Sequence, residues 1–274
     1  MKKAIISRLL NSQSPPFLKP HYYRDRSLFA ARNGRFLSTG SEKVDGSSTL
    51  EEAERVEFTP PKEKLLVLGG NGFVGSHICI EALAHGLDVS SLSRDLLSPD
   101  SLGNAMNGVT SVISCVGGFG SNSYMYDING TANINAIRAA SEQGVKRFVY
   151  ISAADFGLVN YLLKGYYAGK RSTEKELLDK FLHGGVILRP GFIHGTRRVG
   201  SLHLPLSIIG APLEMVLRHA KLLTHLPLIG PLLIPPVNVT SVAKVAVRAA
   251  VDPAFPRCVV DVYGILQHSQ RNPA

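Results

Sequence analysis

The chain has 274 residues, of which 45% are hydrophobic and 19% are charged, a balance typical of a globular protein with one full core. The formal net charge is +9, but residues 1–41 carry eight basic side chains against the single acid Asp25, and the remaining residues are nearly neutral. A nearly neutral body lacks the broad positive field that binds a nucleic-acid backbone, so no nucleic acid is expected as a partner. No metal or disulfide framework is expected either, because the cysteines lie far apart in the sequence, at Cys79, Cys115 and Cys258.

The N-terminal residues have the composition of an organelle targeting segment. They are basic, contain serine, have almost no acid, and carry short apolar clusters rather than one long apolar run. This pattern predicts a mitochondrial transit peptide over residues 1–37 rather than a secretory signal, with residues 35–38 as the processing site. A solvated tail is the alternative. Residues 38–62, rich in Ser, Gly, Glu and Pro, are predicted to form a disordered linker.

The globular fold is predicted to begin at Lys64 with a β-α-β unit. A short apolar run over 65–68 meets glycines, a helical pattern follows over 73–84, and a second strand is predicted over 87–92. Helices and strands then alternate, with helices predicted over 98–106, 129–142 and 167–182 and strands over 109–116, 147–151 and 186–188. Alternation of this kind builds a doubly wound parallel sheet, so an α/β Rossmann domain is predicted for residues 63–190.

Residues 191–274 are less regular and are predicted to form a small substrate-side lobe. They contain Pro- and Leu-rich segments, a helical pattern near 242–250 and a strand pattern over 258–263. Prolines interrupt the most apolar stretch, 202–237, before it reaches the roughly 18 residues of a membrane-spanning helix, so no transmembrane span is predicted. That stretch is expected mainly to fill the core. Sheltering a polyprenyl tail or touching a membrane surface are the alternatives.

Three glycines at 69, 72 and 75 lie directly after the first strand and open the next helix. In a dinucleotide-binding turn the first glycine permits the tight turn, the second lets the backbone approach the pyrophosphate, and the third lets helix and strand pack closely. The helix N-terminus would then bind the phosphates. A tight turn without a ligand is the alternative. The predicted cofactor-binding residues here are Gly69, Asn71, Gly72, Phe73, Val74 and Gly75.

Ser93 and Arg94 end the second strand about 20 residues after the glycines, where an acidic residue would bind the ribose 2′-hydroxyl of NAD. A hydroxyl and a base at this place favour the 2′-phosphate of NADP(H) over NAD(H). The alternative is that Arg94 is a solvated loop charge.

Tyr166 and Lys170 have the spacing Tyr-x-x-x-Lys, which places both side chains on one face of a predicted helix. Together with the spacing Gly-x-x-Gly-x-x-Gly, this pair resembles the short-chain dehydrogenase/reductase superfamily in its extended or atypical branches. The resemblance implies that Tyr166 is the acid/base, that Lys170 lowers its pKa from about 10 and holds the nicotinamide ribose, and that Ser152 binds the substrate carbonyl. A chance Tyr–Lys pair in a protein that binds cofactor without turnover is the alternative.

Three further segments extend the resemblance, which covers roughly residues 64–195. Residues 112–118 would lie beside the adenine ribose, 129–133 would brace the active-site helix, and 188–191 would line the nicotinamide pocket. The cofactor-binding residues implied here are Cys115, Val116, Gly117, Pro190 and Gly191. The alternatives are an ordinary turn at residues 117–118 and a chain reversal at 190–191.

One strand of the family pattern is missing. Asp95 follows Arg94 directly, whereas the family inserts a third strand before such a segment. In the strand order 3-2-1-4-5-6 the third strand lies at the edge, so its loss would leave the central pairing intact and expose the second strand. A splice variant or a faulty gene model is an equally open explanation.

The glycine phrasing, Arg94 and the predicted targeting segment are most similar to the atypical branch. That branch includes the nucleotide-binding accessory subunit of respiratory complex I and the reductase-like subunit of the coenzyme Q synthesis complex. The resemblance implies a protein of the mitochondrial matrix, peripheral to the inner membrane, that acts as an NADPH-dependent oxidoreductase on a hydrophobic carbonyl or quinone-like substrate, linked to ubiquinone biosynthesis. A non-catalytic, cofactor-stabilised subunit of an inner-membrane complex is the second reading, and a sugar-nucleotide epimerase is the third.

Overall fold

The structure is a computed structural model that describes residues 63–93, 96–97, 100–199, 202–205, 207–219 and 230–270. The predicted targeting segment, the predicted linker and Arg94 lie outside the described residues.

Six parallel strands form the main sheet, in the order β10-β5-β4-β3-β1-β2. They are β1 (Lys64–Leu68), β2 (Asp88–Leu92), β3 (Ser111–Ser114), β4 (Arg147–Ile151), β5 (Gly185–Leu188) and β10 (Cys258–Val260). β1 lies between the edge strand β2 and β3, and its Leu68 lies opposite Leu92 of β2 and Ser114 of β3. Because all six strands are parallel, their carboxyl ends meet at one edge of the sheet, where ligands bind in open α/β folds.

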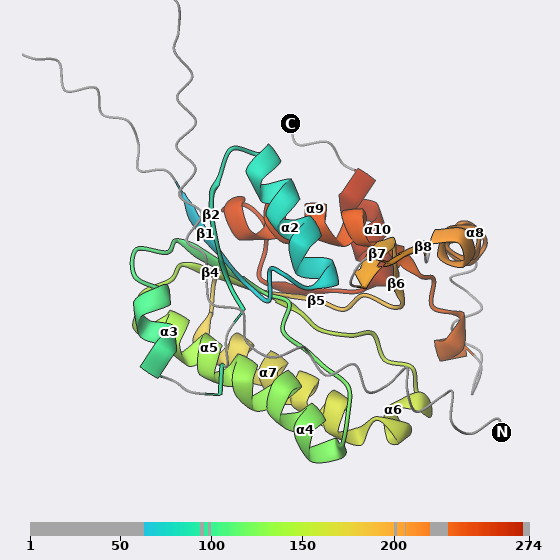
Figure 1. Cartoon of the computed structure of the whole chain (residues 1–274), viewed down its shortest axis with the longest axis horizontal. Helices are drawn as coiled ribbons and strands as arrows, with labels where there is room; N and C mark the ends of the chain where they lie inside the picture. Colours follow the sequence, from blue (N-terminus) through green and yellow to red (C-terminus); the bar gives the residue numbers. More distant parts are fainter. Residues whose placement is uncertain are drawn as a thin grey trace, which may run out of the picture. The chain divides into compact units, whose positions relative to one another are not determined.

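Helices cover both faces of this sheet (Figure 1). One face carries α2 (Phe73–Ala84), α9 (Val239–Val251) and α10 (Val262–Gln270), and the other carries α3 (Asp100–Ala105), α5 (Ala132–Glu142) and α7 (Lys164–Lys180). The strands alternate accordingly: Leu65 and Val67 lie in the core cluster with α2 and α9, whereas Leu66 and Leu68 lie in the cluster with α5 and α7. This is the doubly wound α/β arrangement predicted from the sequence.

The strand order agrees with the predicted absence of an edge strand. β2 forms one edge of the sheet, and no strand in the described part of the chain pairs with its free side. The fully buried side chains of Leu102 and Met106 anchor the crossover from β2 to β3 against α5. The central strands therefore pair fully without a third strand.

The helix predicted over 129–142 begins earlier than expected. The chain enters it through α4 (Asn122–Tyr126) and a π-helical turn, η1 (Asp127–Thr131), before α5 begins. The Ser121 hydroxyl caps α4 by accepting a hydrogen bond from the Tyr124 N–H at 3.3 Å. This serine is an ordinary N-cap residue, and the sequence analysis missed it.

The structure places part of the predicted C-terminal lobe in the Rossmann domain. β10 pairs with β5, with Cys258 opposite Val186 and Val260 opposite Leu188. α9 buries valine and alanine side chains in the same core cluster as Ile78 of α2. The boundary expected at residue 190 is thus corrected for these elements, because a strand of three residues gives no signal in the sequence for the partner with which it pairs.

The remaining elements are short. Between β5 and α9, β6 (Ile193–His194) pairs with β9 (Val237–Asn238), and β7 (Thr196–Val199) forms an antiparallel hairpin with β8 (Leu202–Pro205). The other short elements are α6 (Val159–Leu162), which precedes α7, α8 (Ser207–Leu217) and the 3-10 turn η3 (Gly230–Leu233). None of the helices that the structure describes is long and apolar enough to cross a membrane.

Candidate functional site

A turn of glycines joins β1 to α2. Gly69 has a φ of +80°, in the left-handed region that favours glycine, and its N–H donates to the Leu92 carbonyl at 2.8 Å. Gly75 packs so closely on this turn that an added Cβ would lie 2.2 Å from the Gly69 carbonyl oxygen. Gly72 has an extended backbone that any residue can adopt, and both Gly72 and Asn71 are exposed. The first and third glycines therefore have the geometry expected of them, and the second leaves the N-terminus of α2 open.

Two contacts that the sequence analysis missed hold this turn against β2. The Ser93 hydroxyl, expected to meet a 2′-phosphate, donates to the side-chain oxygen of Asn71 at 2.8 Å. A Cβ on Gly70 would lie 2.3 Å from the Ser91 hydroxyl oxygen, so a larger residue at this position would push the turn away from β2.

Phe73 and Val74 open α2 with half-buried side chains. The Phe73 ring meets the His77 ring edge-on, with the centroids 5.5 Å apart, and a Cβ added to Gly195 would lie 3.1 Å from the Phe73 ring. Val74 packs against the core cluster shared by α2 and α9. Both side chains thus anchor the start of α2 to the protein.

The chain that leaves β3 passes between the glycine turn and α7. A Cβ added to Gly69 would lie 3.5 Å from atoms of both Cys115 and Val116. A Cβ on Gly117 would lie 3.4 Å from Nζ of Lys170. Burial raises the pKa of the Cys115 thiol to about 12, so this cysteine is a protonated packing residue. The structure therefore brings the predicted residues 115–117 between the glycine turn and Lys170.

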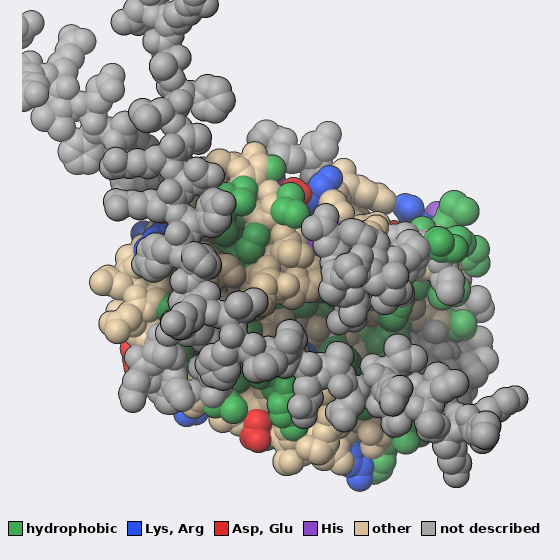
Figure 2. Space-filling model, in the orientation of Figure 1, with side chains coloured by type: hydrophobic (Ala, Val, Ile, Leu, Met, Phe, Trp, Pro, Cys, Tyr) green, Lys and Arg blue, Asp and Glu red, His purple; other side chains and the backbone are tan. Residues whose placement is uncertain are grey.

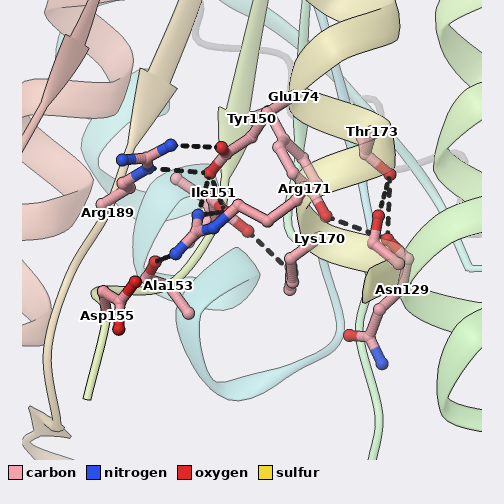
Figure 3. Close-up of polar contacts among 12 residues, drawn as sticks. Asn129, Tyr150, Ile151, Ala153, Asp155, Lys170, Arg171, Thr173, Glu174 and Arg189 are labelled. Carbon is pink, nitrogen blue, oxygen red and sulfur yellow. Dashed lines mark hydrogen bonds and ion pairs between the residues drawn. The ribbon is translucent and has the colours of Figure 1, made fainter. Parts of the chain in front are cut away.

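Asn129 braces α7, as the resemblance implied. Its side-chain amide donates to the Gly118 carbonyl at 2.8 Å, and its own carbonyl accepts from the hydroxyls of Tyr150 at 3.0 Å and Thr173 at 2.9 Å. Figure 3 shows Thr173 directed at Asn129, on the side of α7 from which Lys170 projects. This network fixes the position of α7 and of the helix face that carries Lys170.

Lys170 lies buried beneath the chain segment that follows β3. Its ammonium donates to the Ile151 carbonyl at 2.9 Å and lies 4.7 Å from the centroid of the Tyr150 ring (Figure 3). Burial lowers the pKa of Lys170 to about 7, against the opposing effects of Cys115 and Glu174. The charge of Lys170 therefore changes near neutral pH.

Tyr166 lies one helical turn before Lys170 on the same face of α7, as the spacing predicted. Its ring stacks on Phe119 with the centroids 4.9 Å apart, and the Tyr166 centroid lies 5.7 Å from Nζ of Lys170. Burial raises the pKa of Tyr166 to about 12; Tyr167 adds to the rise and Arg171 opposes it. The expectation that Lys170 lowers this pKa is wrong, because its ammonium is directed at a backbone carbonyl while the phenol is desolvated.

Ser152 is engaged by a buried carboxylate. Its hydroxyl donates to Oε1 of Glu174 at 2.5 Å and accepts from Nη1 of Arg171 at 3.4 Å. Arg171 and Arg189 both bind Glu174, with Nε of Arg189 at 2.9 Å (Figure 3). The Ser152 hydroxyl, predicted to bind the substrate carbonyl, is therefore part of this ionic network.

Glu174 carries the negative charge of the network. Burial raises the pKa of Glu174, but hydrogen bonds from Arg189 and Ser152 outweigh burial and hold the pKa below its usual value. The sequence analysis missed this residue, although it lies four positions after Lys170 on the same helical face. Nothing in the sequence places Arg189 opposite it.

Pro190 and Gly191 follow β5 and pack against protein on two sides. The Pro190 carbonyl accepts from the Ala154 N–H at 2.8 Å. A Cβ on Gly191 would lie 3.1 Å from the Ile234 side chain and from the Pro235 carbonyl oxygen. This contact joins the carboxyl end of β5 to the segment before β9.

Comparison with known proteins identifies the family. The family described as NAD(P)H-binding matches residues 89–204. A protein of Arabidopsis thaliana named "Uncharacterized protein At1g32220, chloroplastic" is 39% identical, in a match that covers 86% of this chain and 86% of the relative. The chain belongs to the NAD(P)H-binding Rossmann family.

Two fungal relatives of this NAD(P)H-binding protein are more distant. MIOREX complex component 2 of Saccharomyces cerevisiae is 25% identical, in a match that covers 70% of this chain and 95% of the relative. "Protein fmp-52, mitochondrial" of Neurospora crassa is 27% identical, in a match that covers 48% of this chain and 65% of the relative. The names of the Arabidopsis and Neurospora proteins place those two relatives in organelles.

Solved structures agree with the fold. RMD from Pseudomonas aeruginosa, solved in complex with NADPH, superimposes with a TM-score of 0.51 and 20% identity over 73% of this chain and 77% of that chain. Other structures of the same fold include sugar-nucleotide epimerases and a short-chain dehydrogenase/reductase. At these identities the likeness establishes the Rossmann fold of the NAD(P)H-binding protein and nothing finer.

Replacing Lys170 by Met should flatten the pH dependence of stability. The unfolded chain keeps a proton on Lys170 up to its ordinary pKa of 10.5, whereas the folded chain releases it above about 7. Lys170 therefore makes the free energy of unfolding rise with pH in this window, by at most about 1.4 kcal/mol per pH unit. Denaturant unfolding of the wild type and Lys170→Met at several pH values between 7 and 9 measures this slope. Lys175→Met, at an exposed position of α7, should keep the wild-type slope, and equal slopes for all three proteins would contradict the assignment.

Replacing Glu174 by Gln should destabilise the protein strongly, because Arg171 and Arg189 would lose their counter-charge and Ser152 would donate to a neutral instead of a charged acceptor. We expect a cost of about 3 kcal/mol, at the low end for a broken buried ion pair because the two arginines are about one-third exposed. The matched control is Glu176→Gln on the same helix, whose partner Arg138 is mostly exposed, so the loss of this pair should cost far less than the loss of Glu174.

The Glu174→Gln substitution should also change how the free energy of unfolding depends on pH in acid. The pKa of Glu174 in the folded protein is held below its usual value. Ionised Glu174 therefore stabilises the fold at any pH above the usual pKa of a glutamate, and this stabilisation is lost as the pH falls through the lower pKa of the folded state. The gap in unfolding free energy between the wild type and Glu174→Gln should therefore narrow in acid. The network as described would be ruled out if Glu174→Gln lost no more unfolding free energy than Glu176→Gln does. It would also be ruled out if the loss caused by Glu174→Gln did not change with pH.

Proposed function

We propose that this protein binds NADP(H) at the carboxyl edge of the sheet, between the glycine turn and α7. The observation that carries the proposal is the close contact of Gly75 with the Gly69 carbonyl, which sets the N-terminus of α2 beside the turn while Gly72 and Asn71 stay exposed. Backbone N–H groups at a helix N-terminus bind phosphate, and the missing Cβ of Gly72 leaves room for a pyrophosphate. Gly117 would let the dinucleotide continue towards Lys170.

Ser93 and Arg94 support NADP(H) over NAD(H). Neither residue is the acid that would bind an unmodified ribose, and Arg94 would supply a positive charge to a 2′-phosphate. Ser93 is already tied to the glycine turn through Asn71, so a phosphate at Ser93 would meet a hydroxyl of fixed position. The neighbouring fold solved with NADPH is consistent with this choice.

For the nicotinamide end, we assign Lys170 to the ribose and Tyr166 to the substrate. A bound nicotinamide would supply the hydride donor or acceptor. Lys170 lies beside the Gly117 position, where its ammonium could donate to ribose hydroxyls. Tyr166 would hold a proton at its phenolic oxygen for a carbonyl or quinone-like substrate, and its raised pKa keeps that proton in place at neutral pH. Pro190 and Gly191 would border this end of the cleft.

A second function, a non-catalytic cofactor-binding subunit, is favoured by a specific observation. Ser152, which would bind the substrate carbonyl in an oxidoreductase, is engaged by Glu174 at 2.5 Å. A relative in yeast is named as a component of a complex. In this reading the dinucleotide stabilises the fold by mass action and is not consumed.

We place the protein in an organelle, with the mitochondrion as the first choice. The basic, acid-poor N-terminal residues support an organelle address, and the Neurospora relative is named mitochondrial. The Arabidopsis relative is named chloroplastic, so the plastid is the competing address. A fusion of residues 1–45 to a fluorescent reporter would distinguish the two, and a diffuse cytosolic signal would exclude both.

Replacing Gly72 by Val should abolish dinucleotide binding while the protein stays folded, because the Gly72 backbone is extended and only an added side chain blocks the phosphates. For the wild type, NADPH at about 100 times its Kd should raise the free energy of unfolding by about 2.7 kcal/mol. A thermal-shift titration with NADPH and NADH measures both the binding and the preference. The control is Gly103→Val, where an added Cβ meets no atom closer than 3.9 Å, and it should bind like the wild type. No shift for the wild type with either dinucleotide would remove the proposed function.

Replacing Tyr166 by Phe separates the two functions. If the protein is an oxidoreductase, turnover of NADPH with a short-chain quinone should fall by about 10²- to 10⁴-fold while the thermal shift with NADPH is unchanged. Tyr124→Phe, at a half-exposed position in α4, serves as the control and should keep full turnover. If the wild type binds NADPH but oxidises it no faster than Tyr166→Phe does, the non-catalytic subunit is the correct reading.

A further inference from the structure

α8 is inverted with respect to an ordinary surface helix. Four of its described hydrophobic side chains face outward: Ile208 is 71% exposed, Met215 and Val216 are each 65% exposed, and Leu213 is 45% exposed. Its only charged side chain, Glu214, is directed inward. A helix on the surface of a globular protein normally buries the apolar residues and exposes the charge, so water is not the expected environment of this outer face.

The inward face of α8 is fixed to the body of the protein. A Cβ on Gly210 would lie 2.3 Å from Cβ of His194, and one turn later Glu214 Oε2 lies 2.6 Å from Nε2 of the buried His194. Gly210 and Glu214 therefore hold α8 against β6 in one rotation. Because of this rotation, Ile208 and Met215, seven positions apart, share the opposite face.

The sequence around α8 is basic. Residues 191–229 contain Arg197, Arg198, Arg218 and Lys221, and Glu214 is their only acid. Glu214 is paired with His194, while Arg218 is exposed at the end of α8. Figure 2 shows hydrophobic side chains gathered at the position of α8, with a basic and a histidine side chain beside them. An occupant of this face must therefore offer an apolar interior and negative charge at its border.

We infer that the outer face of α8 lies on the surface of a lipid bilayer that contains anionic phospholipids. Acyl chains match the apolar side chains, and anionic headgroups match the exposed Arg218 and the basic sequence on either side of α8. The eleven residues of α8 span about 16 Å, about half of a hydrocarbon core of about 30 Å, so the helix would lie in the interface and not cross it. This inference concerns a surface apart from the dinucleotide cleft, and it stands whether or not the protein turns over NADPH.

The test is flotation of the full chain with vesicles of phosphatidylcholine, with and without phosphatidylserine. The α8 variant carries Ile208→Glu and Met215→Glu on the outer face, which leaves the contacts of Gly210 and Glu214 with His194 unchanged. The matched control carries Ile80→Glu and Leu83→Glu on α2, two positions of equal exposure on another helix. All three proteins keep the basic N-terminal residues, so any contribution of that segment to lipid binding is common to them.

We expect the wild type and the α2 variant to bind the anionic vesicles equally, and the α8 variant to bind them at least about tenfold more weakly, since glutamates lose the apolar contact and repel the headgroups. Binding of the wild type should weaken with added salt. Equal binding by all three proteins, or equal loss in both variants, would overturn the inference. It would also fail if light scattering without lipid showed a dimer of the wild type that the α8 variant alone abolished, because the face would then belong to a second copy of the chain. Circular dichroism establishes that each variant is folded.

Discussion

The packing of α2 on the turn after β1 is the contact on which the arrangement of the site depends. Because Gly75 has no side chain, the first turn of α2 lies against the Gly69 carbonyl, and the helix N-terminus is held at the carboxyl end of β1. The chain after β3 then packs on the same turn through Cys115, and from there Gly117 reaches Lys170. The close approach of these backbones thus sets the distance between the N-terminus of α2 and the face of α7 that carries Tyr166 and Lys170. A bound dinucleotide would have to cover this distance.

The environments of Lys170 and Glu174 show how one helix face carries two different kinds of charge. Both side chains are buried and lie one turn apart on α7. Glu174 is held ionised by two arginines and a hydroxyl, whereas Lys170 has a backbone carbonyl and an aromatic ring as neighbours, which do not offset the loss of water. Glu174 therefore fastens α7 to β5 through Arg189, and Lys170 keeps a proton that it can lose near neutral pH. Because the Glu174 ion pairs hold α7 in place, the helix can keep its position when the charge of Lys170 changes.

Local sequence patterns predicted the parts of the fold and site that are themselves local. The glycine turn, the Tyr166–Lys170 face and the parallel alternation each depend on spacing within one element or one connection, and the structure has them where the sequence placed them. The pairing of β10 with β5 and the engagement of Ser152 by Glu174 depend on residues far apart in the chain. No periodicity encodes such partners. The direction of the Tyr166 pKa was wrong for the same reason, since spacing puts an ammonium nearby but does not reveal how much water the fold removes.

The link between α8 and the glycine turn bears on the class of substrate. His194 of β6 binds Glu214 of α8, and the next residue, Gly195, packs so closely on Phe73 that an added Cβ would lie 3.1 Å from its ring. Two packed contacts therefore connect the proposed lipid-facing helix to the first residue of α2. A bilayer against α8 would bring a membrane-soluble substrate to the side of the protein that carries the cofactor cleft. A sugar nucleotide gains nothing from that position, because its charged phosphates keep it in water. The geometry of α8 thus favours a hydrophobic carbonyl or quinone over the epimerase substrates of other proteins with this fold.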